Sequence, residues 1–419
     1  MIKTLSNCRL CAGNFFEKTL KLKSTPPANE LYPTKDSAIK AEKFPLEVVM
    51  CQKCRHVQLK HIVSPKRLFD EYVYKSGTSK FFNEHFDRLA SKIASEFPIN
   101  NYVLEVGSND GVLLTSLNKR GIKSIGIEPS EYLARECINR NLNVYNSYLD
   151  ETTVVKITQS HGKASIVLGN NVFAHIEDMK GAFKNVFEIL EDSGIFIFEV
   201  AHFKYILTDG LFDTIYHEHM SYHTATALES FATTSGFKIF RIEEISSHGG
   251  SLRFYLSKNH DKLKEPSVEL IKNDELQLGL NQVEALSLIE DKIKETKESA
   301  ARMIKDIGLG DNTVFIGYGA PAKVVTFLAQ MELEEINLIG VIEDNVEKQN
   351  RFLPGSGFAI KSLEEMKKLI SVNESNEVCL NFLIFPWNLK KEIVEKLSKW
   401  VPKNSNAVVF FPKVEKVEI

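Results

Sequence analysis

The chain has 419 residues, of which 43% are hydrophobic, and this length predicts two or three domains rather than one. A net charge of -3 excludes the broad positive surface typical of nucleic-acid-binding proteins, and no apolar run approaches the roughly 20 residues of a membrane span. We therefore expect a soluble, cytoplasmic protein, a monomer or weak homodimer, that binds neither nucleic acid nor membrane.

Two CxxC pairs stand near the N-terminus and contain Cys8, Cys11, Cys51 and Cys54. Each CxxC turn presents two thiolates, so two such turns can complete a tetrahedron of sulfur ligands around zinc. A zinc site with four cysteines and no water is structural rather than catalytic. We predict a small zinc-binding domain over residues 1–65; the alternative is four free thiols or a redox pair.

The rest of the chain alternates apolar strands with helices. An amphipathic helical lead-in over 66–100 is followed by unbroken apolar runs, which are typical of a parallel sheet buried on both faces. A helical connector rich in Glu, Lys and Leu, over 263–310, separates two such sets. The predicted strands are 102–107, 124–129, 164–170 and 194–200, then 313–319, 336–344 and 378–385. The sequence therefore predicts an α/β fold with further domains over 66–262 and 311–419.

The first predicted strand ends in LEVGSNDG (104–111), which places a carboxylate and two glycines before a helix. Gly107 and Gly111 allow close backbone approach, and the helix N-terminus offers free N–H groups. Glu128 ends the next strand, where its carboxylate can accept hydrogen bonds from both hydroxyls of a ribose. The ExGxxxG spacing from Glu105 is closer to the S-adenosylmethionine loop of class I methyltransferases than to the GxGxxG of dinucleotide sites. An ordinary strand-to-helix turn without a ligand is the alternative.

A stretch rich in proton carriers, IYHEHMSYHT, spans residues 215–224. Histidine has an unperturbed pKa of about 6.5, which suits it to general-base catalysis near neutral pH. Two other interpretations of the stretch are a pair of metal ligands, His217 and His219, on one face of a strand, and histidines that merely cap or pack locally.

Five motifs follow the CxxC pairs in order: EVGSNDG (105–111), NNVFAHI (170–176), FDTIYHEHMSY (212–222), HGGSLR (248–253) and GYGAPAK (317–323). In this arrangement the chain resembles the sugar C-methyltransferase family, which acts on nucleotide-linked 4-keto-deoxysugars. The resemblance covers nearly the whole chain. It implies a zinc-binding domain, a class I, Rossmann-like methyltransferase domain and a C-terminal Rossmann-like α/β domain that helps to hold the nucleotide.

The same resemblance implies an S-adenosylmethionine-dependent methyltransferase of deoxysugar biosynthesis. Its acceptor would be a carbon next to the C4 ketone of a dTDP-, GDP- or CDP-linked 4-keto-6-deoxysugar, with C3 the commoner position and C5 the alternative. His219 would be the base that forms the enolate, with Glu218 and Tyr216 beside it and His175 facing it. Tyr216 or His175 would donate to the enolate oxygen. An extended backbone would instead send Glu218 away from His219.

The remaining site assignments also follow from the resemblance. For the cofactor they are Glu105, Gly107, Ser108, Asn109, Gly111, Glu128, Asn170, Asn171, Tyr72 and Tyr74. For the substrate they are Arg253, Gly317, Tyr318, Gly319, Lys323 and Arg351. Lys323, in the first turn of a helix after two glycines, favours an anion such as a diphosphate. Plain packing is the alternative for Tyr72 and Tyr74, and a surface ion pair for Arg253. Met220 and His223 stand where aromatic residues are expected, which predicts a reshaped sugar pocket.

Two other classes of function compete with this interpretation. A nicotinamide-dependent oxidoreductase or epimerase would use the two α/β units, but no GxGxxG follows VLEV. A non-catalytic zinc-ribbon adaptor would carry a degenerate methyltransferase fold, but Glu105, Gly107, Glu128 and His219 are all present.

Overall fold

The computed structural model describes residues 2–69, 75–308, 313–331, 333, 336, 338–372, 379–402 and 405–419. Tyr72 and Tyr74, which we expect at the cofactor, lie outside these residues. The described residues form three larger sheets, of four, seven and six strands, and one two-stranded ladder. No helix among them is both long enough and apolar enough to cross a membrane.

The N-terminal sheet has the strand order β11-β4-β3-β2, and all of its pairs are antiparallel. Its outermost strand, β11, comes from the histidine-rich stretch much later in the chain. The sequence pattern does not reveal these strands, because β2 carries lysines on its exposed side and β4 has only three residues. The elements are β1 (Ile2–Thr4), β2 (Phe16–Thr25), α1 (Lys35–Ile39), β3 (Phe44–Cys51), β4 (Val57–Leu59), β5 (His61–Val63), α2 (Pro65–Phe69) and β11 (Ser221–Tyr222).

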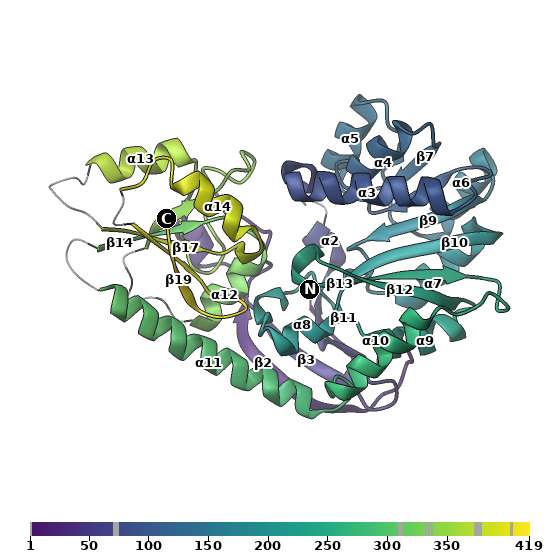
Figure 1. Cartoon of the computed structure of the whole chain (residues 1–419), viewed down its shortest axis with the longest axis horizontal. Coiled ribbons are helices and arrows are strands. Elements are labelled where there is room, and N and C mark those ends of the chain that lie inside the picture. Colours follow the sequence, from purple (N-terminus) through teal and green to yellow (C-terminus); the bar gives the residue numbers. More distant parts are fainter. Residues whose placement is uncertain are drawn as a thin grey trace.

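The central sheet has the strand order β12-β13-β10-β9-β6-β7-β8 (Figure 1). The strands from β10 to β8 pair in parallel, and four of them are the four strands predicted first. β12 and β13 add an antiparallel edge that the sequence analysis did not predict. The strands are β6 (Val103–Val106), β7 (Ser124–Ile127), β8 (Val144–Tyr145), β9 (Ala164–Asn170), β10 (Leu190–Ala201), β12 (Lys238–Ile245) and β13 (Ser251–Ser257).

Helices cover both faces of the central sheet, as expected for buried parallel strands. Phe82 and Phe86 of α3 pack on one face, whereas Phe183 of α7 and Phe231 of α9 pack on the other. The helical elements are η1 (Ser76–Thr78), α3 (Lys80–Glu96), α4 (Val112–Asn118), α5 (Glu131–Asn139), α6 (Glu151–His161), α7 (Met179–Ile189), α8 (Phe203–Thr208), η2 (Phe212–Thr214), α9 (Ala225–Thr234) and η3 (Ser247–Gly249).

Two helices, α10 (Pro266–Gln277) and α11 (Glu284–Ile307), lead to the third sheet, and α11 runs along the edge of the molecule between the two halves (Figure 1). The third sheet has the order β16-β15-β14-β17-β18-β19 and is parallel except for the last pair. Its elements are β14 (Thr313–Tyr318), α12 (Lys323–Met331), β15 (Leu338–Ile342), β16 (Ile360–Lys361), α13 (Leu363–Val372), β17 (Cys379–Ile384), η4 (Trp387–Leu389), α14 (Lys390–Leu397), β18 (Asn406–Val409) and β19 (Glu415–Glu418). The predicted fold class, an α/β protein with a cysteine-rich N-terminal region and two Rossmann-like sheets, is confirmed.

Candidate active site

The four N-terminal cysteines lie together as predicted, with all of their Sγ atoms within 4.8 Å of one another. The Sγ atoms of Cys8 and Cys54 are 3.5 Å apart, as are those of Cys11 and Cys51. A tetrahedral zinc ion with Zn–S bonds of about 2.3 Å would hold its sulfurs about 3.8 Å apart, so these spacings fit zinc. Four thiolates would fill every position on the ion, which makes its role structural.

The two CxxC turns share one backbone geometry. The residue after each pair, Ala12 or Arg55, has a positive φ of 56° or 60°. Its N–H donates at 2.9 Å to the carbonyl of the first cysteine of the pair. Two turns far apart in the chain therefore have the same shape, as two halves of one metal site require.

The zinc-binding region also holds the histidine-rich stretch in place. β4 pairs with β11, and the N–H of Leu59 donates to the Met220 carbonyl at 3.0 Å. On the other side, His217 Nε2 lies 3.0 Å from the Thr25 carbonyl oxygen. The backbone around His219 is thus held from both sides by the first domain.

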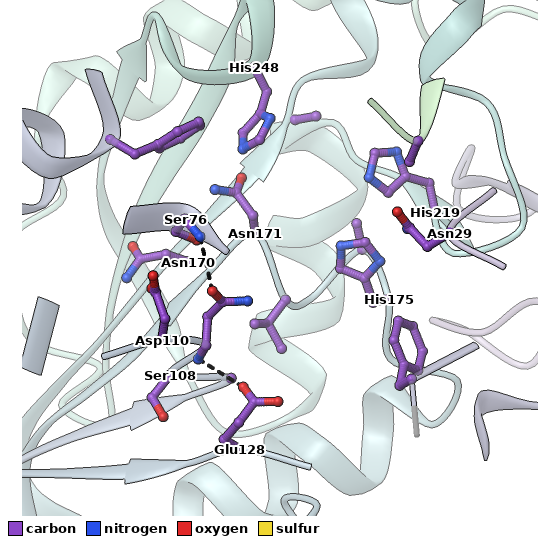
Figure 2. A pocket seen from close by; sticks show the side chains of 18 of the residues that line it. Asn29, Ser76, Ser108, Asp110, Glu128, Asn170, Asn171, His175, His219 and His248 are labelled. Atoms are coloured by element: carbon purple, nitrogen blue, oxygen red, sulfur yellow. Dashed lines mark hydrogen bonds between the residues drawn. The ribbon is translucent and has the colours of Figure 1, made fainter. Parts of the chain in front are cut away.

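A cavity of about 740 Å³ lies between the carboxyl ends of the central strands and the C-terminal sheet. Figure 2 shows part of its wall, with Glu128, His175 and His219. This volume falls in the range of small-molecule sites. Predicted residues in its wall are Glu105, Gly107, Ser108, Asn109, Glu128, Asn170, Asn171, His175, Tyr216, His219, Tyr318, Gly319 and Lys323. Gly111 and Gly317 stand behind the wall, where a Cβ would lie 2.5 Å from Leu142 Cδ1 and 2.7 Å from Phe385 Cε2, respectively.

The end of β6 forms a backbone cradle at one side of the cavity. Gly107 has φ 66° and donates its N–H to the Ile127 carbonyl at 2.8 Å. A side chain is excluded there, because a Cβ would lie 2.4 Å from a methyl carbon of Val172. Glu128 accepts hydrogen bonds from the N–H groups of Asn109 at 2.8 Å and of Ser130 at 2.9 Å, which hold its carboxylate at the cavity wall.

Acidic and unpartnered polar groups surround this cradle. Glu105 Oε2, Ser108 Oγ and Asp110 Oδ1 are buried and have no hydrogen-bond partner among the described residues. Burial raises the pKa of Glu105 and Asp110, and it raises that of Glu128 to about 7. Buried polar groups are normally hydrogen-bonded, so unpartnered ones at a cavity wall indicate a polar ligand. The ribose hydroxyls, amine and positive charge of S-adenosylmethionine fit this set.

His219 and His175 lie next to each other, with ring centroids 4.9 Å apart. His219 Nδ1 is 2.8 Å from the Thr214 carbonyl, and Nε2 is 2.7 Å from the Tyr216 hydroxyl. A carbonyl can only accept, so Nδ1 carries the proton of the neutral ring and Nε2 accepts from Tyr216. His175 Nδ1 donates in the same way to the Glu218 carbonyl at 2.7 Å. Burial lowers the pKa of both histidines, so each is a neutral ring with an acceptor at Nε2.

A turn decides which side chains of this stretch reach the cavity. The N–H of His219 donates to the Tyr216 carbonyl at 2.9 Å, so these two side chains come together on one side. His217 and Glu218 are buried behind the turn. Glu218 Oε1 accepts from the backbone N–H and the Nδ2 of Asn29, at 3.2 and 3.1 Å. The Glu218 carboxyl therefore points away from His219. An extended backbone was expected to cause this separation, but the structure has a turn instead.

The end of β14 forms a second cradle on the opposite domain. Gly319 has φ 80° and donates its N–H to the Ile342 carbonyl at 2.7 Å. Glu343 accepts from the N–H groups of Ala320 at 2.7 Å and of Asn345 at 2.9 Å. This carboxylate thus occupies the same place after the second strand as Glu128 does in the first cradle.

Two lysines give the second cradle positive charge. Lys323 Nζ lies 3.9 Å from the centre of the Trp387 ring and 4.0 Å from Asp213 Oδ2. Burial lowers the pKa of Lys323 to about 8, an effect that Asp213 opposes. Lys348 is also buried, and its Nζ donates to the Ala320 carbonyl at 2.8 Å. An anionic ligand such as a diphosphate suits this arrangement.

Four further residues named by the sequence analysis also lie away from the cavity wall. Arg253 is 6% exposed and donates from Nε to Glu199 at 2.6 Å, so it forms a buried ion pair rather than a surface one. Arg351 is exposed and does not line the cavity. Met220 and His223 are buried in the interior and do not line the cavity.

Sequence reasoning missed many residues of the wall, among them the polar residues Asn29, His248, Glu343 and Lys348. Glu343 ends a predicted strand as Glu128 does, and that parallel would have found it. His248 stands in a quoted motif, but only the structure shows its left-handed φ of 54° and its ring 4.9 Å from that of Phe82. No local pattern marks Asn29, which reaches the cavity through long-range folding alone.

Known proteins match the chain along almost its full length. Family models described as "Putative zinc binding domain", "Methyltransferase domain" and "C-methyltransferase C-terminal domain" match residues 8–69, 76–242 and 246–412, respectively. The C-methyltransferase NovU of Streptomyces niveus is 26% identical over 416 residues, which cover 99% of this chain and 97% of that protein.

Solved methyltransferases are more distant. The magnesium protoporphyrin IX methyltransferase of Synechocystis PCC 6803, with bound SAH, is 16% identical and has a TM-score of 0.33; the match covers 42% of this chain and 82% of that one. The CcbJ methyltransferase of Streptomyces caelestis is 12% identical with a TM-score of 0.33, over 46% and 94% of the two chains. Likeness at this level carries no conclusion about the substrate.

Proposed function

Because the chain belongs to the C-methyltransferase family, we propose that it methylates a carbon next to the C4 ketone of a nucleotide-linked 4-keto-6-deoxysugar. The acceptor carbon is C3, with C5 the alternative. The observation that carries this proposal is the single cavity whose wall contains the Glu128 cradle, the His219–Tyr216 pair and the Lys323 cradle. A cofactor, a proton acceptor and an anion-binding end are what this reaction needs in one place.

S-adenosylmethionine, when bound, supplies a methyl group that is electrophilic because it is attached to a sulfonium. Glu128 would accept hydrogen bonds from the ribose hydroxyls, and the N–H of Asn109 fixes that carboxylate. The glycine at 107 lets the ligand approach the backbone without a side chain in the way. Asp110 and Glu105 would offer their unpartnered carboxyl oxygens to polar groups of the cofactor.

His219 and Tyr216 carry out the proton chemistry. The Tyr216 hydroxyl moves its hydrogen bond from His219 Nε2 to the ketone oxygen, which frees Nε2 to take the proton from the neighbouring carbon. The electrons of that C–H bond become the enolate, and its oxygen accepts from Tyr216, a contribution of about 3 kcal/mol per donor. The Thr214 carbonyl holds Nδ1–H and stabilises the imidazolium. His175 is a neutral acceptor at Nε2, so Tyr216 rather than His175 is the donor.

The nucleotide end of the substrate lies in the second cradle. Lys323 and Lys348 offset the charge of the diphosphate, and Gly319 allows it to approach the backbone at the end of β14. Tyr318 and Gly319 line the cavity there, whereas Arg253 acts through its ion pair with Glu199 and not on the substrate.

Incubation with S-adenosylmethionine and dTDP-, GDP- and CDP-linked 4-keto-6-deoxysugars in deuterated buffer, read by mass spectrometry, tests the proposal. We expect one methyl group to be added to one of these sugars. Deuterium incorporation without methylation would support the proposed base and contradict the proposed cofactor. Neither change with any ketosugar, in protein that binds the cofactor, would refute the proposal.

A further inference from the structure

Asn29 belongs to the first domain but lies in the wall of the reaction cavity. It lies in the loop between β2 and α1, far from the cofactor cradle in sequence. Figure 2 shows its side chain on the side of the cavity where His219 and His175 lie. The zinc-binding region therefore contributes a polar side chain of its own to the space around the proposed base.

The Asn29 amide has a fixed orientation. Its Nδ2 and its backbone N–H both donate to Glu218 Oε1, at 3.1 and 3.2 Å. The nitrogen is thereby turned toward Glu218, and the amide oxygen is left as the group that a ligand can meet. Within the described part of the chain, no group donates to Asn29 Oδ1.

Glu218 is held in a place where it cannot easily change partners. It is 1% exposed, and its second oxygen, Oε2, is buried without a hydrogen-bond partner among the described residues. Burial raises the pKa of this carboxyl, so its negative charge is disfavoured. A buried acceptor of this kind serves to hold the Asn29 amide rather than to exchange protons with solvent.

We infer that Asn29 positions the substrate, its amide oxygen accepting a hydrogen bond from a hydroxyl or amine on the ring carbon beside the ketone, and that Glu218 acts through Asn29 by fixing the amide. This inference rests on the proposed function. An amide oxygen only accepts, so a donor on the sugar is the group it recognises. The bond fixes the ring so that the carbon to be methylated faces His219.

Asn29→Ala, Glu218→Ala and Glu218→Gln separate this role from a structural one. We expect Asn29→Ala and Glu218→Ala each to lower kcat/KM about 10- to 30-fold, the effect of losing one buried hydrogen bond. Their double variant should lose no more than either alone, since both remove the same contact. Glu218→Gln keeps an oxygen acceptor for Asn29 and should recover activity to within about threefold of the unmodified protein.

A pair of substrates tests the recognised group directly. The probes are the 4-keto-6-deoxysugar nucleotide that the unmodified protein methylates and its counterpart that lacks the donor beside the ketone. The unmodified protein should prefer the first by about 10-fold or more, and Asn29→Ala should lose most of that preference. Cofactor affinity and zinc content should stay the same in every variant, which excludes misfolding as the cause.

Each contrary result has a distinct meaning. If Asn29→Ala keeps the full preference between the two probes, the inference is overturned while the proposed function stands. If Glu218→Gln is as inactive as Glu218→Ala, Glu218 acts through its proton and not through Asn29. If the unmodified protein methylates no ketosugar at all, the proposed function itself fails, before any variant is compared.

Discussion

The central domain and the C-terminal domain end their first strands in the same backbone cradle but place different ionisable side chains around it. In both, a glycine with positive φ, Gly107 or Gly319, donates its N–H to the neighbouring strand. In both, the glutamate after that neighbouring strand, Glu128 or Glu343, accepts from two backbone N–H groups. The two strand ends therefore share one arrangement of a glycine turn and a carboxylate held by backbone N–H groups.

The difference between the cradles lies in the side chains around them. Glu105 and Asp110 interact electrostatically with Glu128, whereas Lys348 interacts with Glu343. Lys323 lines the cavity shortly after Gly319 of the second cradle. A cationic cofactor suits the first set, and an anionic diphosphate suits the second. Under the proposed function, the two cradles therefore share a backbone arrangement and take different ligands because the ionisable side chains around them differ.

The largest effect should come from replacing His219, which belongs to neither cradle. His219→Asn removes the proposed base, so we expect methyl transfer and deuterium exchange to fall by about 10³-fold. Both ligands should still bind with unchanged affinity by calorimetry, because neither cradle is altered. His217→Gln is the matched control, since His217 is buried behind the same turn and its replacement can still donate to Thr25. Loss of cofactor binding in His219→Asn would contradict this separation.

Single replacements of Glu128 and of Glu343 with alanine compare the two cradles directly. Glu128→Ala should weaken binding of the cofactor product about 10- to 100-fold and leave nucleoside diphosphate binding unchanged, since charged hydrogen bonds are lost at one end only. Glu343→Ala should weaken nucleoside diphosphate binding by a similar factor and leave the affinity for the cofactor product unchanged. Titration calorimetry with each ligand measures both. Unchanged nucleoside diphosphate affinity in Glu343→Ala would show that the second cradle is only a structural turn.

Local patterns in the sequence were enough to predict much of the first cradle and the zinc site. The spacing of the cysteines in each pair and the apolar strands are short-range patterns, so they can be identified from the sequence alone. The second glycine turn and Lys323 were recognised as well. Glu343 was not predicted as a site residue, because the only feature that marks it is its position after a strand, which matches the position of Glu128.

The reaction centre was less predictable, because its geometry depends on contacts between distant segments. Glu218 is next to His219 in the chain, yet a turn places it against Asn29 on the other side. Arg253 carries a charge in a family motif, but Glu199 on the neighbouring strand neutralises it in the interior. Neither partner can be identified until the sheet is assembled.

A smaller effect should appear in the pH dependence of the first cradle. The pKa of Glu128 is raised to about 7, so its carboxylate forms only as the pH rises through that value. Cofactor binding needs the carboxylate to accept from the ribose hydroxyls. Affinity should therefore increase about 10-fold between pH 6 and pH 8, by calorimetry, and Glu128→Gln should remove the dependence. A flat profile in the unmodified protein would rule out ionised Glu128 as the ribose acceptor.

The second cradle should respond to pH in the opposite direction, and with the smallest change. Lys323 has a pKa lowered to about 8, so it loses its positive charge as the pH rises through 8. Nucleoside diphosphate affinity should fall about threefold to tenfold between pH 7 and pH 9, because one ion pair with the diphosphate is lost. Lys323→Met should bind more weakly at pH 7 and show little further change. The affinity for the cofactor should rise as the pH passes 7, and the affinity for the nucleotide should fall as the pH passes 8. When both ligands are below saturation, kcat/KM should therefore peak between pH 7 and pH 8. If both affinities instead changed in the same direction, the ionisation of Glu128 and Lys323 would not govern binding.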